Sequence, residues 1–259
     1  MDYNQLKADA RQRVSLANPS PHRITCQYWL ILLVFIALSE WGSYYLESAI
    51  NDVSGISAIV MRNNSTLFLL LISFVVQVLA TIWSTGYIHY SMSLSRGEEN
   101  VGFEKITQVF RRFFSVLLLL ILEYFLVVLW TCLFIIPGIV AAYRYRYALY
   151  ILLENPDIAP MEAISRSKQM TRGYKIQMFF LDLNLLWYQI LASVGTIVFT
   201  IYTYELLPLP YTDRNTYVLL GITYLFSMFV DILFLPFYHT TLSNAYYWVK
   251  EQRQQVQEP

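Results

Sequence analysis

Residues 113–136 read FFSVLLLLILEYFLVVLWTCLFII, a run in which Glu123 is the only charged side chain. As a helix this run is about 36 Å long at 1.5 Å per residue, enough to cross a hydrocarbon core of about 30 Å. We therefore interpret Phe113–Ile136 as a membrane-spanning helix. The rest of the chain is best understood outward from this segment.

The overall composition agrees with a membrane protein. The chain has 259 residues, of which 56% are hydrophobic and 14% charged, and its mean hydropathy is +0.43. Soluble domains are about 45–50% apolar and about 25% charged. With 18 basic and 18 acidic residues there is no basic excess. The composition therefore excludes a soluble enzyme, a disordered chain and a nucleic-acid-binding protein.

Other apolar stretches predict further spans, and the expected fold is an all-α polytopic helical membrane protein. The clear candidates besides the first are Tyr28–Tyr45, Leu67–Tyr90, Ile176–Tyr204 and Thr216–Tyr238. Gly138–Leu153 is only about 24 Å long as a helix and contains Arg144 and Arg146. Hydropathy alone leaves that short segment undecided.

Loop charge favours a crossing by Gly138–Leu153. Lys and Arg concentrate in the cytoplasmic loops of membrane proteins, and here they are dense in 1–27, 91–112, 155–175 and 249–259. Six spans place all these segments inside, with both termini cytoplasmic, in a single membrane domain over 1–259. The alternative is that Gly138–Leu153 forms a bent or re-entrant arm, which is tolerated only inside protein or beside a water-filled cavity.

Two local signals flank the short segment. Pro137 and Gly138 predict the helix break before it, because proline removes a backbone donor and glycine tolerates a tight reversal. After it, Pro160 predicts the first position of a short cytoplasmic helix that ends near Gly173. Within this helix Glu162 and Arg166 have the spacing of a favourable ion pair.

The basic residues of this helix predict a contact with the membrane surface. They are Arg166, Lys168, Arg172 and Lys175. We expect them to lie near anionic lipid headgroups. The alternative is a docking site for an unidentified membrane or cytoplasmic protein.

Residues 136–183 read IPGIVAAYRYRYALYILLENPDIAPMEAISRSKQMTRGYKIQMFFLDL. The segment resembles an uncharacterised family of bacterial integral membrane proteins, the domain of unknown function number 975. The matching elements are Ile136-Pro137-Gly138, Tyr143, Tyr145, Tyr147, Asn155-Pro156, Glu162-Ala163-Ile164-Ser165 and Gly173, with Gly86-Tyr87, Arg96-Gly97-Glu98 and Tyr246-Tyr247 elsewhere. Arg144 and Arg146 depart from its pattern. The resemblance implies a bacterial plasma-membrane location and a multi-span fold, but no activity.

No catalytic, cofactor or metal motif is present in the sequence. We find no HExxH, GxxxxGK[ST], GxGxxG or GxSxG pattern. Cys26 and Cys132 are far apart in the chain and lack metal-ligand spacing. We therefore expect no enzyme, no cofactor and no metal.

Charged residues in or near the spans are the remaining functional signal, because such residues are rare in membranes. They are Glu40, Glu123, Arg144, Arg146, Asp182 and Asp231. Arg144 and Arg146 point about 200° apart in a helix, so they cannot share one carboxylate. We expect one of them to pair with Glu123 or Asp231, and the other to snorkel or to line a polar cavity.

Two functions remain open on these grounds. The first is a non-enzymatic interaction, accessory or stress-linked component of the plasma membrane, whose charges only orient helices. The alternative is a small transporter or permease component with a polar path containing Glu123, Arg144, Arg146 and Asp231. A membrane-embedded enzyme lacks a recognisable set of reacting groups.

Overall fold

The structure is a computed structural model of the whole chain. It describes the backbone of all residues except 52–55, 99, 204–212 and 258–259, and the side chains of all residues except 40–66, 69, 99, 203–217 and 256–259. The few basic residues of 46–66 and 205–215 lead us to expect outer loops there, but the backbone described within 46–66 is helical, as the end of α2 and the start of α3, whereas most of 205–215 lies outside the described residues.

The described residues form helices and connecting turns, with no strand among them, so the all-α fold class is confirmed. The helices are α1 (Tyr3–Leu16), α2 (Pro21–Asn51), α3 (Ile56–Arg96), α4 (Glu104–Thr107), the 3-10 turn η1 (Gln108–Arg112), α5 (Phe113–Leu133), α6 (Ile135–Tyr145), α7 (Ala148–Glu154), α8 (Pro160–Met170), α9 (Lys175–Thr203) and α10 (Asp213–Gln257).

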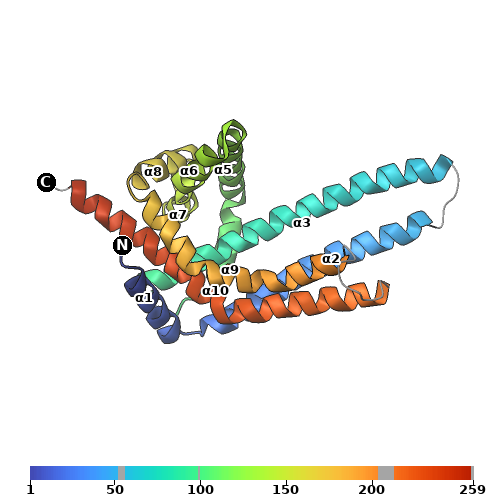
Figure 1. Cartoon of the computed structure of the whole chain (residues 1–259), viewed down its shortest axis with the longest axis horizontal. Helices are drawn as coiled ribbons and strands as arrows, with labels where there is room; N and C mark the ends of the chain where they lie inside the picture. The colour runs from blue at the N-terminus through green and yellow to red at the C-terminus, as the bar shows by residue number, and fades with distance from the viewer. Residues whose placement is uncertain (52–55, 99, 204–212, 258–259) are drawn as a thin grey trace.

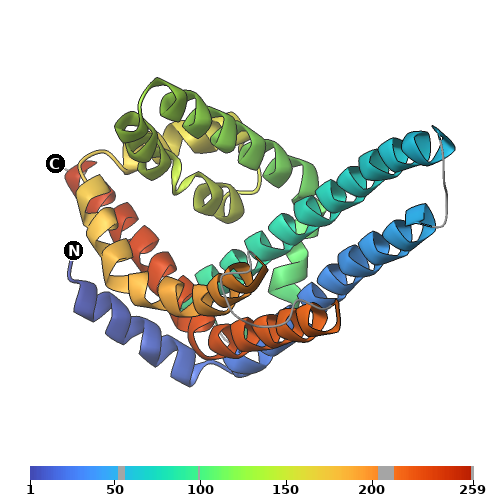
Figure 2. The same ribbon diagram turned by 45° about the vertical axis from the view of Figure 1, so that its right-hand side comes forward.

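Five helical segments in the described part of the chain are long and apolar enough to cross a bilayer. They are Pro21–Ser39, Leu70–Arg96, Glu104–Leu133, Lys175–Tyr202 and Val218–Gln255. Four of them, in α2, α3, α9 and α10, run side by side, whereas α5 leaves this bundle at a steep angle (Figures 1 and 2).

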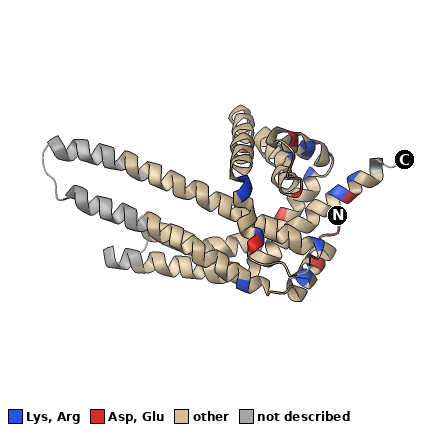
Figure 3. Cartoon of the chain, turned by 180° about the vertical axis from the view of Figure 1, so that it is seen from behind, with Lys and Arg blue, Asp and Glu red and all other residues tan. Residues whose placement is uncertain are grey.

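The surface of these helices is apolar where they project from the rest of the molecule. Phe74 in α3, Phe114 in α5 and Leu225 in α10 are 67%, 82% and 63% exposed. Charged residues gather instead at the opposite end, around α1, α8 and the last turns of α10 (Figure 3). Water would penalise such exposed apolar area, so a lipid environment accounts for it.

The segment Gly138–Leu153 does not form the single short span that we predicted. It is divided between α6 and α7, which meet at Arg146 and Tyr147. The hydroxyl of Ser167 in α8 accepts a hydrogen bond from the Tyr147 N–H at 3.2 Å and donates to the Arg144 carbonyl at 3.0 Å. Side chains of α8 thus satisfy the backbone groups that the break leaves free, which stabilises a bent arm instead of a straight helix.

The break before α6 also lies three residues earlier than predicted. Phe134 has the extended conformation, with φ −162° and ψ 149°, and α6 begins at the next residue. Pro137 is therefore in the first turn of α6, where its missing N–H is not needed. Gly138 has another role, since a Cβ there would lie 2.8 Å from the Thr131 Cα. Its small size lets α6 pack closely on α5.

The short helix expected after Gly138–Leu153 begins where the sequence predicts. Pro160 is the first residue of α8, and Gly173 adopts a φ of +90° just beyond its end. The predicted pair is present, with Arg166 Nη2 2.6 Å from Glu162 Oε1. Ala163 and Ile164 are buried against the core.

The longest of the described helices, α10, connects the apolar bundle to the charged end of the molecule. It contacts α1, α2, α3, α8 and α9. Pro236 lies in its interior, and the helix bends near its middle (Figure 1), as expected where proline removes a helical hydrogen bond. The first half lies along α2 and α9, and the second half reaches the charged end.

Replacing Gly138 by Ala should destabilise the protein by about 1–3 kcal/mol, because the new methyl group pushes α6 away from Thr131. Gly221→Ala in α10 is the matched control, since a Cβ there meets nothing within 4 Å. That change should be neutral or stabilising by up to about 1 kcal/mol. Thermal unfolding of both variants in detergent measures the difference, and equal stability would contradict the close packing of α5 and α6.

Candidate functional site

The first polar cluster joins Arg146, at the break between α6 and α7, to Asp182 in α9. Arg146 Nη2 donates to Asp182 Oδ1 at 2.7 Å, and Nη1 donates to Oδ2. The hydroxyl of Tyr143 also donates to Asp182 Oδ2, at 2.8 Å. Such a two-pronged pair fixes both the distance and the orientation of the helices. Our prediction that an arginine pairs with Glu123 or Asp231 is therefore wrong, because the arginine's partner is Asp182.

Arg144 faces a different neighbour, which confirms that the two arginines do not share a carboxylate. Its guanidinium carbon lies 6.0 Å from the centre of the Trp130 ring in α5. This is a cation–π contact. Arg144 therefore lies against the α5–α6 hairpin, and its backbone carbonyl is held by Ser167 and Thr171 of α8.

The second polar cluster surrounds Asp231 in α10. Trp29 Nε1 of α2 donates to Asp231 Oδ2 at 3.1 Å, and Tyr188 Oη of α9 donates to Oδ1 at 2.6 Å. Each carboxylate oxygen thus has a donor from a different helix. Both donors are uncharged, so Asp231 links three helices without an arginine.

Glu123 stands apart from both clusters. It is half-buried in α5, and no hydrogen bond or ion pair joins it to any residue whose side chain is described. Of the charged residues singled out from the sequence, the side chain of Glu40 lies outside the described residues. Among the other five, the structure brings together only Arg146 and Asp182.

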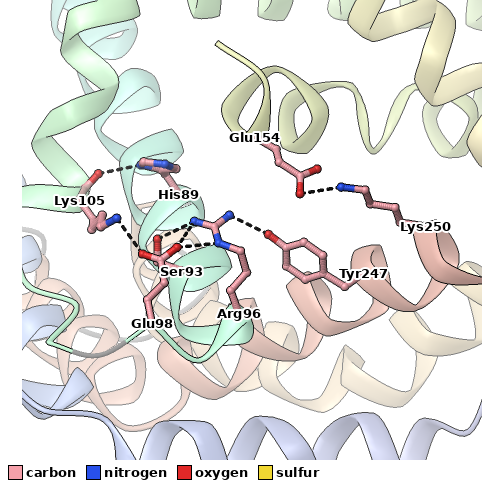
Figure 4. A network of polar contacts seen from close by, with 8 residues as sticks. All are labelled: His89, Ser93, Arg96, Glu98, Lys105, Glu154, Tyr247 and Lys250. Atoms are coloured by element: carbon pink, nitrogen blue, oxygen red, sulfur yellow. Dashed lines mark hydrogen bonds and ion pairs between the residues drawn. The ribbon is translucent and has the colours of Figure 1, made fainter.

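A third polar network lies at the charged end of the molecule, where α3 ends (Figure 4). Glu98 accepts from Arg96 Nε at 2.6 Å and from Lys105 Nζ at 2.8 Å. Arg96 also donates to the hydroxyls of Ser93 and Tyr247, at 3.1 and 2.9 Å. The network therefore joins the end of α3 to α4 and to α10.

A neighbouring set of polar contacts joins α10 to α7. Glu154 at the end of α7 accepts from Tyr246 Oη at 2.6 Å and from Lys250 Nζ at 2.7 Å. Tyr247 bonds Arg96 (Figure 4), and its neighbour on α10, Tyr246, bonds Glu154. Tyr246 thus links α10 to the end of α7, and Tyr247 links it to the end of α3.

A cavity of about 540 Å³ opens beside this network. Its lining includes His89, Arg96, Glu98, Arg112 and Glu154. The His89 ring donates from Nδ1 to the Lys105 carbonyl at 3.0 Å. In the described part of the chain no group of three His, Cys, Asp or Glu residues could hold a metal ion.

Sequence reasoning missed Lys105 and Glu154 as members of this network. The available signal was indirect: Arg96-Gly97-Glu98 and Tyr246-Tyr247 were noted as family-like elements, and both contribute to the network. Gly86, from the same set, allows close packing, since a Cβ there would lie 3.1 Å from the Ile106 carbonyl carbon. These elements are thus explained by packing and polar contacts at the charged end.

Asp182→Asn should lower the free energy of unfolding by about 1–3 kcal/mol, because it leaves the Arg146 charge without its carboxylate. This loss is smaller than that expected for a fully buried pair, because the Asp182 and Arg146 side chains are 33% and 19% exposed. Glu162→Gln is the matched control, since it breaks a pair that is 47% and 48% exposed and should cost about 0.5 kcal/mol or less. Thermal unfolding of Arg146→Gln, Asp182→Asn and the double variant completes the test. Additive losses would contradict the pairing.

Glu98 should make stability depend on pH. Burial by itself would raise the pKa of Glu98, but hydrogen bonds and charge from Lys105 and Arg96 outweigh it and lower the pKa below its usual value. Its stabilising effect is therefore present above the unfolded-state pKa of about 4.3 and is lost as the pH falls through the lower folded-state value. Glu98→Gln should melt about 2–4 °C below the wild type at pH 6, and the two should converge only as the pH falls below the lowered folded-state pKa of Glu98. A constant difference across this range would contradict the assignment.

Comparison with known proteins gives one family match. Residues 132–253 match the family model described as "Protein of unknown function (DUF975)". The match covers just under half of the chain, from the end of α5 to the last turns of α10, so Gly86-Tyr87 and Arg96-Gly97-Glu98 lie outside it. No curated protein and no solved structure matches the chain. The resemblance inferred from the sequence is thus confirmed over residues 132–253, which match the model of this uncharacterised family.

Proposed function

We propose that this protein is a non-enzymatic, multi-pass component of a bacterial plasma membrane. Its role would be that of an interaction, accessory or stress-linked component. In this proposal both termini are cytoplasmic, and the charged end formed by α1, α8 and the last turns of α10 faces the cytoplasm. The distribution of basic residues supports that orientation. The charged end is then the surface available to a protein partner.

The observation that carries this proposal is the way the half-buried charges on the long helices are used. Asp182 is bonded to Arg146 and Tyr143, and Asp231 to Trp29 and Tyr188. Each set of donors comes from other helices, so the carboxylates hold the bundle together. A transport path needs polar groups that meet a solute in turn. Here Arg146 and Asp231 belong to separate clusters, which favours a structural role for both.

A small transporter or permease component is the second candidate, favoured by Glu123 alone. This carboxylate lies within an apolar helix and has no partner among the described side chains. An unpaired charge at the centre of a span costs roughly 2.5–3.5 kcal/mol on insertion scales. Such a cost is tolerated where the group binds a proton or a cation.

Two measurements on the full-length protein separate these candidates. A photo-cross-linking residue at exposed Asp157, between α7 and α8, should give a discrete protein adduct in native membranes. The matched position is Leu225, 63% exposed on the apolar surface of α10, where only lipid adducts are expected. Proteoliposomes tested with protons and potassium ions should show no flux above empty vesicles.

The proposal is overturned if Asp157 gives no protein adduct and the proteoliposomes carry a flux that Glu123→Gln abolishes. Glu123→Gln should then leave the melting temperature unchanged or raised, because it removes an unpaired charge. A flux that persists in this variant would exclude Glu123 from the path.

A further inference from the structure

A second cavity lies between α7, α8 and α10, with a volume of about 450 Å³. This is within the usual range of about 300–1,000 Å³ for small-molecule sites. Its charged lining is mostly cationic, with Arg166 and Arg172 from α8 and the turn after it, and Lys250 and Arg253 from α10. Glu154 is the one acidic residue among those that line it. Four basic side chains against one carboxylate make this an anion-attracting cavity.

The four cations differ in what already holds them. Lys250 is paired with Glu154 at 2.7 Å, and Arg166 with Glu162 at 2.6 Å. Arg253 donates from Nε to the Met170 carbonyl at 3.2 Å and from Nη2 to the Arg172 carbonyl. It also stacks on Tyr174, with 5.2 Å between its guanidinium carbon and the ring centre. Arg253 is thus fixed in place before any ligand arrives.

Arg172 is the cation that remains uncommitted. Its side chain has no hydrogen-bond or ion-pair partner among the described residues, although it lines the cavity. The chain reverses at the next residue, Gly173, whose φ of +90° suits glycine. This reversal leaves Arg172 at the end of α8 beside the carbonyls that hold Arg253. A guanidinium without a protein partner that lines the same cavity as a fixed one suits a phosphate group, which accepts several charge-assisted hydrogen bonds.

The surroundings of the cavity indicate where such a phosphate group would come from. Helix α8 packs against α5, whose Ile121 and Phe125 are 56% and 60% exposed on the apolar surface. The cavity also contains apolar Ile151 and Met170. A lipid with its chains along α5 would thus bring its headgroup close to α8.

We propose that the cavity between α7, α8 and α10 is a binding site for a phosphate-bearing anion, with Arg172 and Arg253 as its principal ligands and Lys250 and Arg166 at its edge. The chemistry suits an anionic lipid headgroup or a free phosphate compound. The site differs from a general basic surface because Lys168 and Lys175 do not line the cavity, whereas two cations of α10 do. It is independent of whether the protein is an accessory component or moves a solute.

The test uses the full-length protein in a neutral detergent, with native mass spectrometry to measure binding. The probes are short-chain phosphatidylglycerol, short-chain phosphatidylcholine and inorganic phosphate. We expect one phosphatidylglycerol to bind more tightly than phosphatidylcholine, and Arg172→Gln to weaken it about tenfold through the lost charge-assisted hydrogen bonds. Arg172→Lys should recover part of that loss, because it keeps the charge but not the planar fork.

Lys168→Gln is the matched control. It removes the same charge from an exposed position in α8, four residues before Arg172 and outside the cavity, and should change binding less than about twofold. Both variants should melt like the wild type, since neither side chain has a partner in the described structure.

The outcomes separate the two sources of phosphate and the failure of the proposal. If inorganic phosphate binds as tightly as phosphatidylglycerol with the same dependence on Arg172, the site takes a free phosphate compound. If phosphatidylglycerol binds with this dependence on Arg172 and inorganic phosphate does not, the site takes an anionic lipid headgroup. If Arg172→Gln and Lys168→Gln weaken binding equally, or if neither anionic probe binds, the cavity is part of a diffuse basic surface and the proposal is wrong.

Discussion

A carboxylate inside a hydrocarbon layer must receive its hydrogen bonds from protein, and this constraint organises the helices of the molecule. Asp182 and Asp231 each lie on a long apolar helix, and each is met by donors from other helices. Lipid-facing apolar residues can slide past one another at little cost, because lipid chains are as apolar as leucine. The two carboxylates therefore set which helices lie together and at what height.

The apolar runs alone were sufficient to predict the helical membrane fold and five of its long helices. Length and hydropathy act locally, so a run such as Phe113–Ile136 has one low-energy solution in lipid. The start of α8 could also be predicted, because Pro160 and the spacing of Glu162 and Arg166 act within a single helix. Contacts within a few residues of each other are visible in a sequence.

Contacts between distant segments were not predictable in the same way. The break between α6 and α7 depends on Ser167 and Thr171, about 20 residues further along the chain. The partner of Arg146 was mistaken for the same reason: charge alone does not distinguish Glu123, Asp182 and Asp231, and the geometry of packing selects Asp182. The Arg96–Tyr247 contact joins residues that are 151 positions apart, so only the resemblance to a family marked its members at all.

The bend of α10 near Pro236 divides this helix into two halves that run in different directions (Figure 1). Its first half carries Asp231 among apolar helices, and its second half carries Tyr246, Tyr247 and Lys250 to the charged end. The two halves are one continuous helix. A single helix therefore satisfies two different surroundings, with Asp231 bonded among apolar helices on one side of Pro236 and Tyr246, Tyr247 and Lys250 bonded to Glu154 and Arg96 on the other.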